Sequence, residues 1–247
     1  MKIAIASYAF HGLLQRGQID VFGYLEACRY RYDLRTADIW NGMLPRLDED
    51  ALALVKEALE QREMTLENLC VDGAHVWDDD PAVREANHQN ALAALRAAAF
   101  LGAKTIRIDA GGQGETFTNE QFDLIVTRFR EYAQFAHDHG FKFGPENHWG
   151  PEVVPENMLR ICQAVDHPAF GVLLHFRGNA GDALMAPWAM HTHISWDICE
   201  NCLPESLEPL RARQYAGAYS VEHHSGANEY ANVAVQLARV RALLATW

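Results

Sequence analysis

Short apolar segments alternate with amphipathic ones along the whole chain, and this alternation restricts the fold more than any other feature of the sequence. The segments with the length and pattern of strands are Ile3–Ser7, Thr36–Trp40, Met64–Val71, Thr105–Asp109, the run from Phe141 that ends in Glu146, Phe170–Leu174, Met190–Ile194 and Ala218–Val221. Parallel neighbours need a crossover connection, so strict alternation of strands and helices predicts a parallel sheet.

Helices are expected between these strands, several of them opened by residues with capping chemistry. The expected helices are Val21 to about Arg31, Asp48–Gln61, Pro81 to about Leu101, Thr118 or Asn119 to Gly140, Pro155–Val165, Ala183–Trp188, Glu205–Gln214 and Glu229–Leu244. The segment Ala183–Trp188 has the weakest pattern. Loops are expected after the first strand, through Gly17, and after the seventh strand. Such a repeat over 247 residues predicts an α/β fold, a (β/α)8 TIM barrel with one domain over residues 1–247, rather than an open doubly wound sheet. No GxGxxG fingerprint follows an early strand.

The charge and cysteine content exclude several classes of protein. The formal net charge is −12 and no run of Lys and Arg is present, which argues against nucleic-acid binding and against attachment to a membrane surface. The first residues, MKIAIASYAF, are too short and strand-like for a signal peptide, so we expect a cytoplasmic protein. An odd number of cysteines fits reduced thiols, and no second pair accompanies Cys199 and Cys202 to complete a zinc ribbon. The oligomeric state stays open, with a homo-oligomer as one alternative.

Polar residues gather at the predicted carboxyl ends of the strands, which is where the active site of a TIM barrel lies. In FKFGPENHWG, Glu146 and His148 point the same way if the strand extends that far, and together they suit a divalent cation or an acid–base pair. The polar residues at the strand ends are Tyr8, His11, Trp40, His75, Arg107, Asp109, Glu146, His148, His175, His191, His193, Glu222 and His224. A lone histidine is more often structural, but so many at one end of the barrel predict a site.

Motifs at four of these strand ends resemble those of a known family. A Glu in the context ENHxG ends the fifth strand, GN follows the sixth, HxH lies on the seventh, and a Glu follows the eighth. This pattern resembles the xylose isomerase-like TIM-barrel superfamily, which includes sugar phosphate isomerases and epimerases and AP endonuclease family 2. The resemblance covers essentially the whole chain. It implies the fold and the position of the site, whereas the motifs are too loose to imply a substrate.

The resemblance also implies one divalent metal ion, held in that family by Glu, Asp, His and Glu from the fifth to eighth strands. Glu146, His193 and Glu222 match three of these ligands, with His191 as a same-face competitor of His193. The sixth strand departs from the pattern, because LLHFRGN stands where the family reads LDxGN and places His175 at the Asp position. Two carboxylates and two imidazoles favour manganese, zinc, cobalt or nickel over magnesium. Loss of the metal is the alternative.

The function that the resemblance implies is a metal-dependent isomerase or epimerase that acts on a small sugar or polyol through an enediolate. Glu146 and Glu222 would exchange the proton while also binding the metal. Substrate contacts are expected from His148, His224, Trp40, Trp149 and His75. The alternatives are a lyase of the same superfamily, of the inosose dehydratase or C-glycoside-cleaving type, an endonuclease IV-like nuclease, and a non-catalytic barrel subunit. The acidic charge disfavours the nuclease, and WDICENCLPESLEP replaces the glycine-rich loop that is common after the seventh strand.

Overall fold

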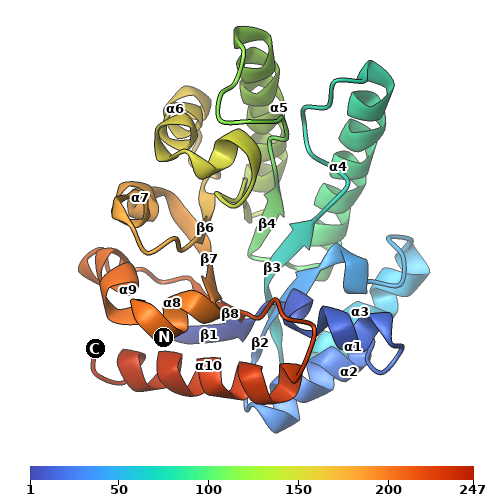
Figure 1. Cartoon of the computed structure of the whole chain (residues 1–247). Helices are drawn as coiled ribbons and strands as arrows, with labels where there is room; N and C mark the ends of the chain where they lie inside the picture. Colours follow the sequence, from blue (N-terminus) through green and yellow to red (C-terminus); the bar gives the residue numbers. More distant parts are fainter.

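Parallel strands form a closed inner layer in the computed structural model, which describes residues 1–247 (Figure 1). The strands are β1 (Lys2–Ile5), β2 (Thr36–Trp40), β3 (Thr65–Val71), β4 (Thr105–Ile108), β5 (Lys142–Gly144), β6 (Val172–His175), β7 (Ala189–Ser195) and β8 (Ala218–Glu222). Continuous ladders join β2-β3-β4-β5 into one half and β1-β8-β7-β6 into the other. Isolated bridges, Ala6–Asp38 between β1 and β2 and Glu146–Leu173 between β5 and β6, connect the halves. The predicted (β/α)8 barrel is confirmed.

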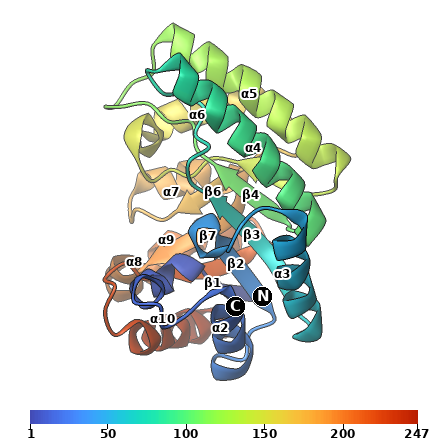
Figure 2. The ribbon, with the colours of Figure 1, turned by 90° about the vertical axis from the view of Figure 1, so that its right-hand side faces the viewer.

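The helices surround this barrel. They are α1 (His11–Gln15), α2 (Val21–Glu26), α3 (Glu49–Gln61), α4 (Pro81–Leu101), α5 (Asn119–Asp138), α6 (Pro155–Val165), α7 (Ala180–Met185), α8 (Trp196–Asn201), α9 (Leu203–Ala212) and α10 (Glu229–Leu244). The long helices α4 and α5 pack against each other on the outside of the sheet (Figure 2). A single cluster of 67 buried apolar residues spans the strand and helix layers, so one core holds both together. No helix is long and apolar enough to cross a membrane.

The helix ends follow the capping chemistry of the sequence. Asp20 and Asp48 accept hydrogen bonds from backbone N–H groups in the first turns of α2 and α3. Thr118 forms a reciprocal capping box at the start of α5. Gly102 ends α4 with a φ of 71°, a left-handed conformation that glycine adopts at little cost. The three N-caps end the segments that follow β1, β2 and β4, which lie at the rim of the barrel.

Three local expectations were wrong. The segment after β1, expected to be a loop through Gly17, forms a 3-10 turn (Ser7–Phe10) and α1. The segment after β7 forms α8 immediately, because the Ser195 side chain accepts a hydrogen bond from the Ile198 N–H. The helix of the sixth repeat begins at Ala180, earlier than expected, because Asn179 caps it. Short helices therefore border the rim directly after β1 and β7.

Candidate active site

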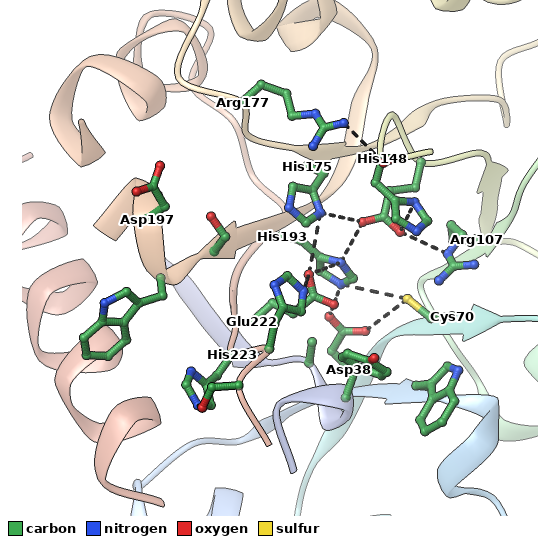
Figure 3. A pocket seen from close by; sticks show the side chains of 18 of the residues that line it. Asp38, Cys70, Arg107, His148, His175, Arg177, His193, Asp197, Glu222 and His223 are labelled. Carbon is green, nitrogen blue, oxygen red and sulfur yellow. Dashed lines mark hydrogen bonds and ion pairs between the residues drawn. The ribbon is translucent and has the colours of Figure 1, made fainter. Parts of the chain in front are cut away.

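A cavity of about 920 Å³ opens at the carboxyl ends of the strands, the end of the barrel where the polar residues were expected to meet (Figure 3). Strands on all sides of the barrel contribute to its floor and walls. β3 and β4 each contribute one residue, Cys70 and Arg107, and β2 contributes Asp38 and Trp40. The remaining lining is dominated by charged and imidazole side chains. The cavity is therefore a polar pocket suited to a hydroxylated or charged small molecule.

The four expected metal ligands, Glu146, His175, His193 and Glu222, lie together at the bottom of this cavity. Each offers one ligand atom, and these atoms lie within 4.8 Å of one another. Glu146 Oε1 is 2.9 Å from His175 Nδ1 and 3.0 Å from His193 Nδ1. Glu222 Oε2 is 3.6 Å and 3.5 Å from the same two nitrogen atoms. All four side chains are buried.

This donor set fits a single divalent ion. Metal bonds of about 2.0–2.2 Å to N and O ligands place neighbouring ligand atoms roughly 3–4 Å apart, which matches the spacing here. The buried Glu222 Oε2 accepts no aligned hydrogen bond, although His224 Nε2 lies 3.0 Å away. A buried carboxylate oxygen without a hydrogen bond is costly, and a bound cation would remove that cost.

His175, which stands where the family pattern has an aspartate, reaches the other three ligand atoms from the sixth strand. His175 faces the other ligands with Nδ1, which is two bonds from Cβ, as a carboxylate oxygen of Asp is. The strand end is held in place by Asn147, whose side chain accepts from the His175 N–H and donates to its C=O, at 2.7 Å and 3.0 Å. The departure from the family pattern therefore changes the charge and softness of a ligand but not its reach.

The close packing of carboxylates and imidazoles shifts their pKa values. Burial acts to raise the pKa of Glu146, but the charges of His148 and His193 and hydrogen bonds from His175 and His193 hold that pKa well below its usual range. Burial opposes the shift at Glu222 too, yet His193 and His224 lower its pKa to about 2. The pKa of His193 is raised well above its ordinary value, because Glu222, Glu146 and Asp38 outweigh its burial. The metal-free pocket therefore holds anionic carboxylates around a cationic His193.

A buried guanidinium supports one of the two glutamates. Arg107 Nε lies 3.2 Å from Glu146 Oε2, and its NH1 group lies 2.9 Å from both Asp109 Oδ2 and Asp72 Oδ1. No guanidinium pairs with Glu222, whose neighbours His175, His193 and His224 are all imidazoles. Arg107 and Asp109 were noted as strand-end residues, but no role followed from the sequence.

Of the expected substrate contacts, His148, His224 and Trp40 line the cavity. His148 Nδ1 lies 3.3 Å from Glu146 Oε2 even though β5 ends at Gly144, because the turn after Pro145 brings it back. Trp149 and His75 line an adjoining cavity of about 290 Å³ instead and pack edge to face. We therefore leave these two out of the proposed substrate contacts.

Sequence reasoning missed the residue beneath the four expected ligands. Asp38 lies in the middle of β2, fully buried, and its Oδ2 is 3.0 Å from His193 Nε2 and 2.8 Å from His191 Nε2. His191 and His193 both contact Asp38, but only His193 also belongs to the four-ligand group. A charged residue inside the strand TADIW was the available signal, because buried charge in a strand needs partners. At the rim, Arg177 and Trp196 were missed as well.

The fold resembles that of several solved proteins. Three solved structures are similar over nearly their full lengths: D-allulose 3-epimerase from Methylomonas sp. (14% identity, 98% of each chain covered, TM-score 0.77), the probable 3-DHS dehydratase AsbF from Bacillus anthracis (16%, 99% of each, 0.74) and D-psicose 3-epimerase from Clostridium cellulolyticum H10 (16%, 100% of this chain and 98% of that one, 0.73). No curated protein sequence matches.

Identities this low establish the shared fold alone. The sequence itself carries the stronger link, because residues 28–178, more than half of the chain, match the profile of the family described as the xylose isomerase-like TIM barrel. That segment includes Glu146 and His175, two of the four clustered ligands. The chain therefore belongs to the xylose isomerase-like TIM-barrel family.

Proposed function

We propose that the protein is a metal-dependent isomerase or epimerase of a small sugar or polyol, working by proton transfer through an enediolate. The observation that carries this proposal is the convergence of Glu146 and Glu222, from opposite halves of the barrel, on one group of ligand atoms at the floor of a polar cavity. Two carboxylates that approach from different strands suit removal of a proton on one side of a carbon and its return on the other.

Glu146, His175, His193 and Glu222 would hold the metal, with manganese, zinc, cobalt or nickel preferred over magnesium. When bound, such an ion would polarise the carbonyl oxygen and stabilise the negative charge of the enediolate. His148 and His224, both beside a glutamate and facing the cavity, would hold substrate hydroxyls. Trp40 offers an apolar surface for the carbon skeleton.

The chain's own residues divide the proton transfer between them. Glu222 Oε2 has no aligned hydrogen bond, so one oxygen of this carboxylate could bind the ion while the other takes the proton from the carbon that bears the hydroxyl. The electron pair of the broken C–H bond then enters the enediolate. Glu146, which pairs with Arg107, would deliver to the other face a proton taken up from solvent, and Glu222 would release its own proton to solvent.

This inequality of the two glutamates also favours a second candidate, a lyase of the same superfamily. Elimination needs one base at carbon and an acid at the leaving hydroxyl, and the pairing of Arg107 with Glu146 leaves Glu222 as the freer base. The products distinguish the candidates, because a lyase yields an unsaturated or deoxy product and an isomerase preserves the molecular formula.

The test is turnover of candidate ketoses and polyols in D2O by metal-loaded protein, followed by NMR. We expect an isomer or epimer with deuterium at the reacting carbon, and a loss of about 10²–10⁴-fold in turnover for Glu146→Gln and for Glu222→Gln. Glu67→Gln is the matched control, since Glu67 is a buried carboxylate that pairs with Lys2 at the other end of the barrel. Undiminished turnover in Glu222→Gln would remove that residue from the mechanism, and elemental analysis without metal after loading would remove the ion.

A further inference from the structure

The buried Asp38 carboxylate lies at hydrogen-bond distance from four side chains. Its Oδ2 lies 2.8 Å from His191 Nε2, 3.0 Å from His193 Nε2 and 2.7 Å from Ser220 Oγ, and its Oδ1 accepts from Asn68 Nδ2 at 2.9 Å. An ionised carboxylate has no hydrogen to give, so the two ring nitrogens that face it must each carry one. Both His191 and His193 therefore have a hydrogen on Nε2.

This proton placement decides which atom of His193 is free to bind a metal. In a neutral imidazole with a hydrogen on Nε2, the lone pair is on Nδ1. His193 Nδ1 faces Glu146 Oε1 at 3.0 Å and Glu222 Oε2 at 3.5 Å, within the four-ligand group. A ring with its hydrogen on Nδ1 would present a donor there and could not act as a ligand.

At Asp38 the regular pairing of β2 with β3 is interrupted, and other contacts hold the backbone in place. The pairing of β2 with β3 shifts register between Ala37 and Asp38, so Glu67 has no partner across the ladder. Such a bulge re-aims the side chains beside it. The Asp38 N–H donates to the buried Tyr24 hydroxyl at 2.9 Å, and that hydroxyl donates to the Ile5 C=O on β1 at 2.6 Å. Asp38 is fixed from both neighbouring strands.

A second metal ion at Asp38, His191 and His193 is the competing interpretation of the same cluster, because their ligand atoms also lie within 4.8 Å of one another. The contacts argue against it. The donors already converge on Oδ2 at hydrogen-bond distance, and an ion between them would replace three hydrogen bonds and require both Nε2 hydrogens to leave. The geometry is that of a hydrogen-bond hub.

We propose that Asp38 is a positioning residue that keeps the hydrogen of His193 on Nε2 and directs Nδ1 at the metal. The proposal rests on the metal site of the proposed function. It gives Asp38 a defined task behind a ligand, comparable to the carboxylates that orient metal-bound histidines generally, whose loss typically costs about 10–100-fold in metal affinity.

The experiment compares wild type, Asp38→Asn and the Glu67→Gln control in two measurements. Zinc and manganese affinities are determined by competition with a chelator, and the imidazole nitrogens are observed by NMR in protein labelled with 15N-histidine, with His193 assigned through a His193→Gln variant. We expect metal binding about 10–100-fold weaker in Asp38→Asn and unchanged in the control. An Asn side chain presents an N–H2 group to this ring of donors, so the His193 Nε2–H signal should be lost or displaced.

The two measurements separate the two proposals. A wild type that binds no metal refutes the metal site, whereas the NMR spectrum of metal-free protein, recorded at a pH high enough for a neutral His193, still reports which ring nitrogen carries the hydrogen. Unchanged affinity together with an unchanged His193 spectrum in Asp38→Asn would overturn the positioning role. Two bound ions in wild type, with one lost on substitution, would overturn it as well, because Asp38 would then be a ligand. If Asp38→Asn does not fold, a wild-type His193 with its hydrogen on Nδ1 in zinc-loaded protein is enough to refute it.

Discussion

Replacing His175 by Asp tests whether this side chain is the ligand that the geometry indicates. The substitution preserves reach, because the new carboxylate oxygen would stand close to the present position of Nδ1, which is 2.9 Å from Glu146 Oε1 and 3.6 Å from Glu222 Oε2. At an effective dielectric constant of about 20, a unit negative charge there would be repelled by roughly 5 kcal/mol from each of these carboxylates. Without metal, the variant should therefore be less stable than wild type.

Proton uptake limits this loss. Protonating an Asp with an unfolded pKa of about 3.9 costs roughly 4 kcal/mol at pH 7 and roughly 1.5 kcal/mol at pH 5, and the folded protein cannot lose more than that through this group. The new carboxyl has a raised folded pKa, so the penalty is largest at high pH and falls as the pH is lowered. For a chain of this size, about 4 kcal/mol corresponds to a Tm lower by roughly 8–16 °C.

The assay is thermal unfolding at pH 5 and pH 7, with and without manganese or zinc, with His175→Asn as the control that has the same shape and no charge. We expect a metal-free Tm for His175→Asp below that of His175→Asn at pH 7, a smaller difference at pH 5, and recovery with metal. The preference for zinc over manganese should fall by about tenfold or more, since a hard oxygen replaces a nitrogen. Equal metal-free Tm values for the two variants, together with an unchanged metal preference, would show that residue 175 does not face the other ligands.

Three further results are expected. His193→Ala should weaken metal binding without unfolding the protein, and excess metal should restore part of the lost turnover in a steady-state assay. The raised pKa of His193 means that its proton competes with the metal up to a pH above 6.5, so affinity should rise by up to about tenfold per pH unit across the neutral range, and calorimetry in buffers of different ionisation enthalpy should detect release of a proton. Metal-loaded protein should not cleave an abasic DNA duplex at ordinary salt, because a chain of net charge −12 gains little from counterion release, and cleavage would contradict that reasoning.

The sequence predicted the fold well because its information is periodic and local. Strand positions followed from apolar runs, and helix ends followed from residues such as Asp20, Asp48 and Gly102, whose capping chemistry acts within one turn. The carboxyl ends of all strands in a TIM barrel meet at one rim. Glu146 and Glu222 were therefore expected to lie close together, although 75 residues separate them in the sequence.

Asp38 was not found by this reasoning because its role depends on contacts that no local pattern contains. It interrupts an apolar strand, and its partners lie on β3, β7 and β8. Trp196 was missed for a different reason, since the segment after β7 was expected to be a loop, whereas the Ser195 cap starts α8 at once and brings Trp196 to the rim. Trp149 and His75 were expected at the site only because they follow strand ends. That position does not determine which of the two adjoining cavities such a residue lines.

The candidate site lies where the strand pairing of the barrel is interrupted. The two four-stranded halves meet through isolated bridges, one of which involves Asp38 and another Glu146. His193, on the other half, contacts both of these residues, with Nε2 3.0 Å from Asp38 Oδ2 and Nδ1 3.0 Å from Glu146 Oε1. Side-chain contacts at the site thus supplement a ladder that is incomplete at both seams. A metal bound by Glu146 from one half and by ligands from the other would join the halves further, and binding of this kind stabilises the folded state by RT ln(1 + [M]/Kd), or about 2.7 kcal/mol at a hundredfold excess over Kd. The same four side chains would therefore both hold the proposed ion and strengthen the connection between the two halves of the barrel.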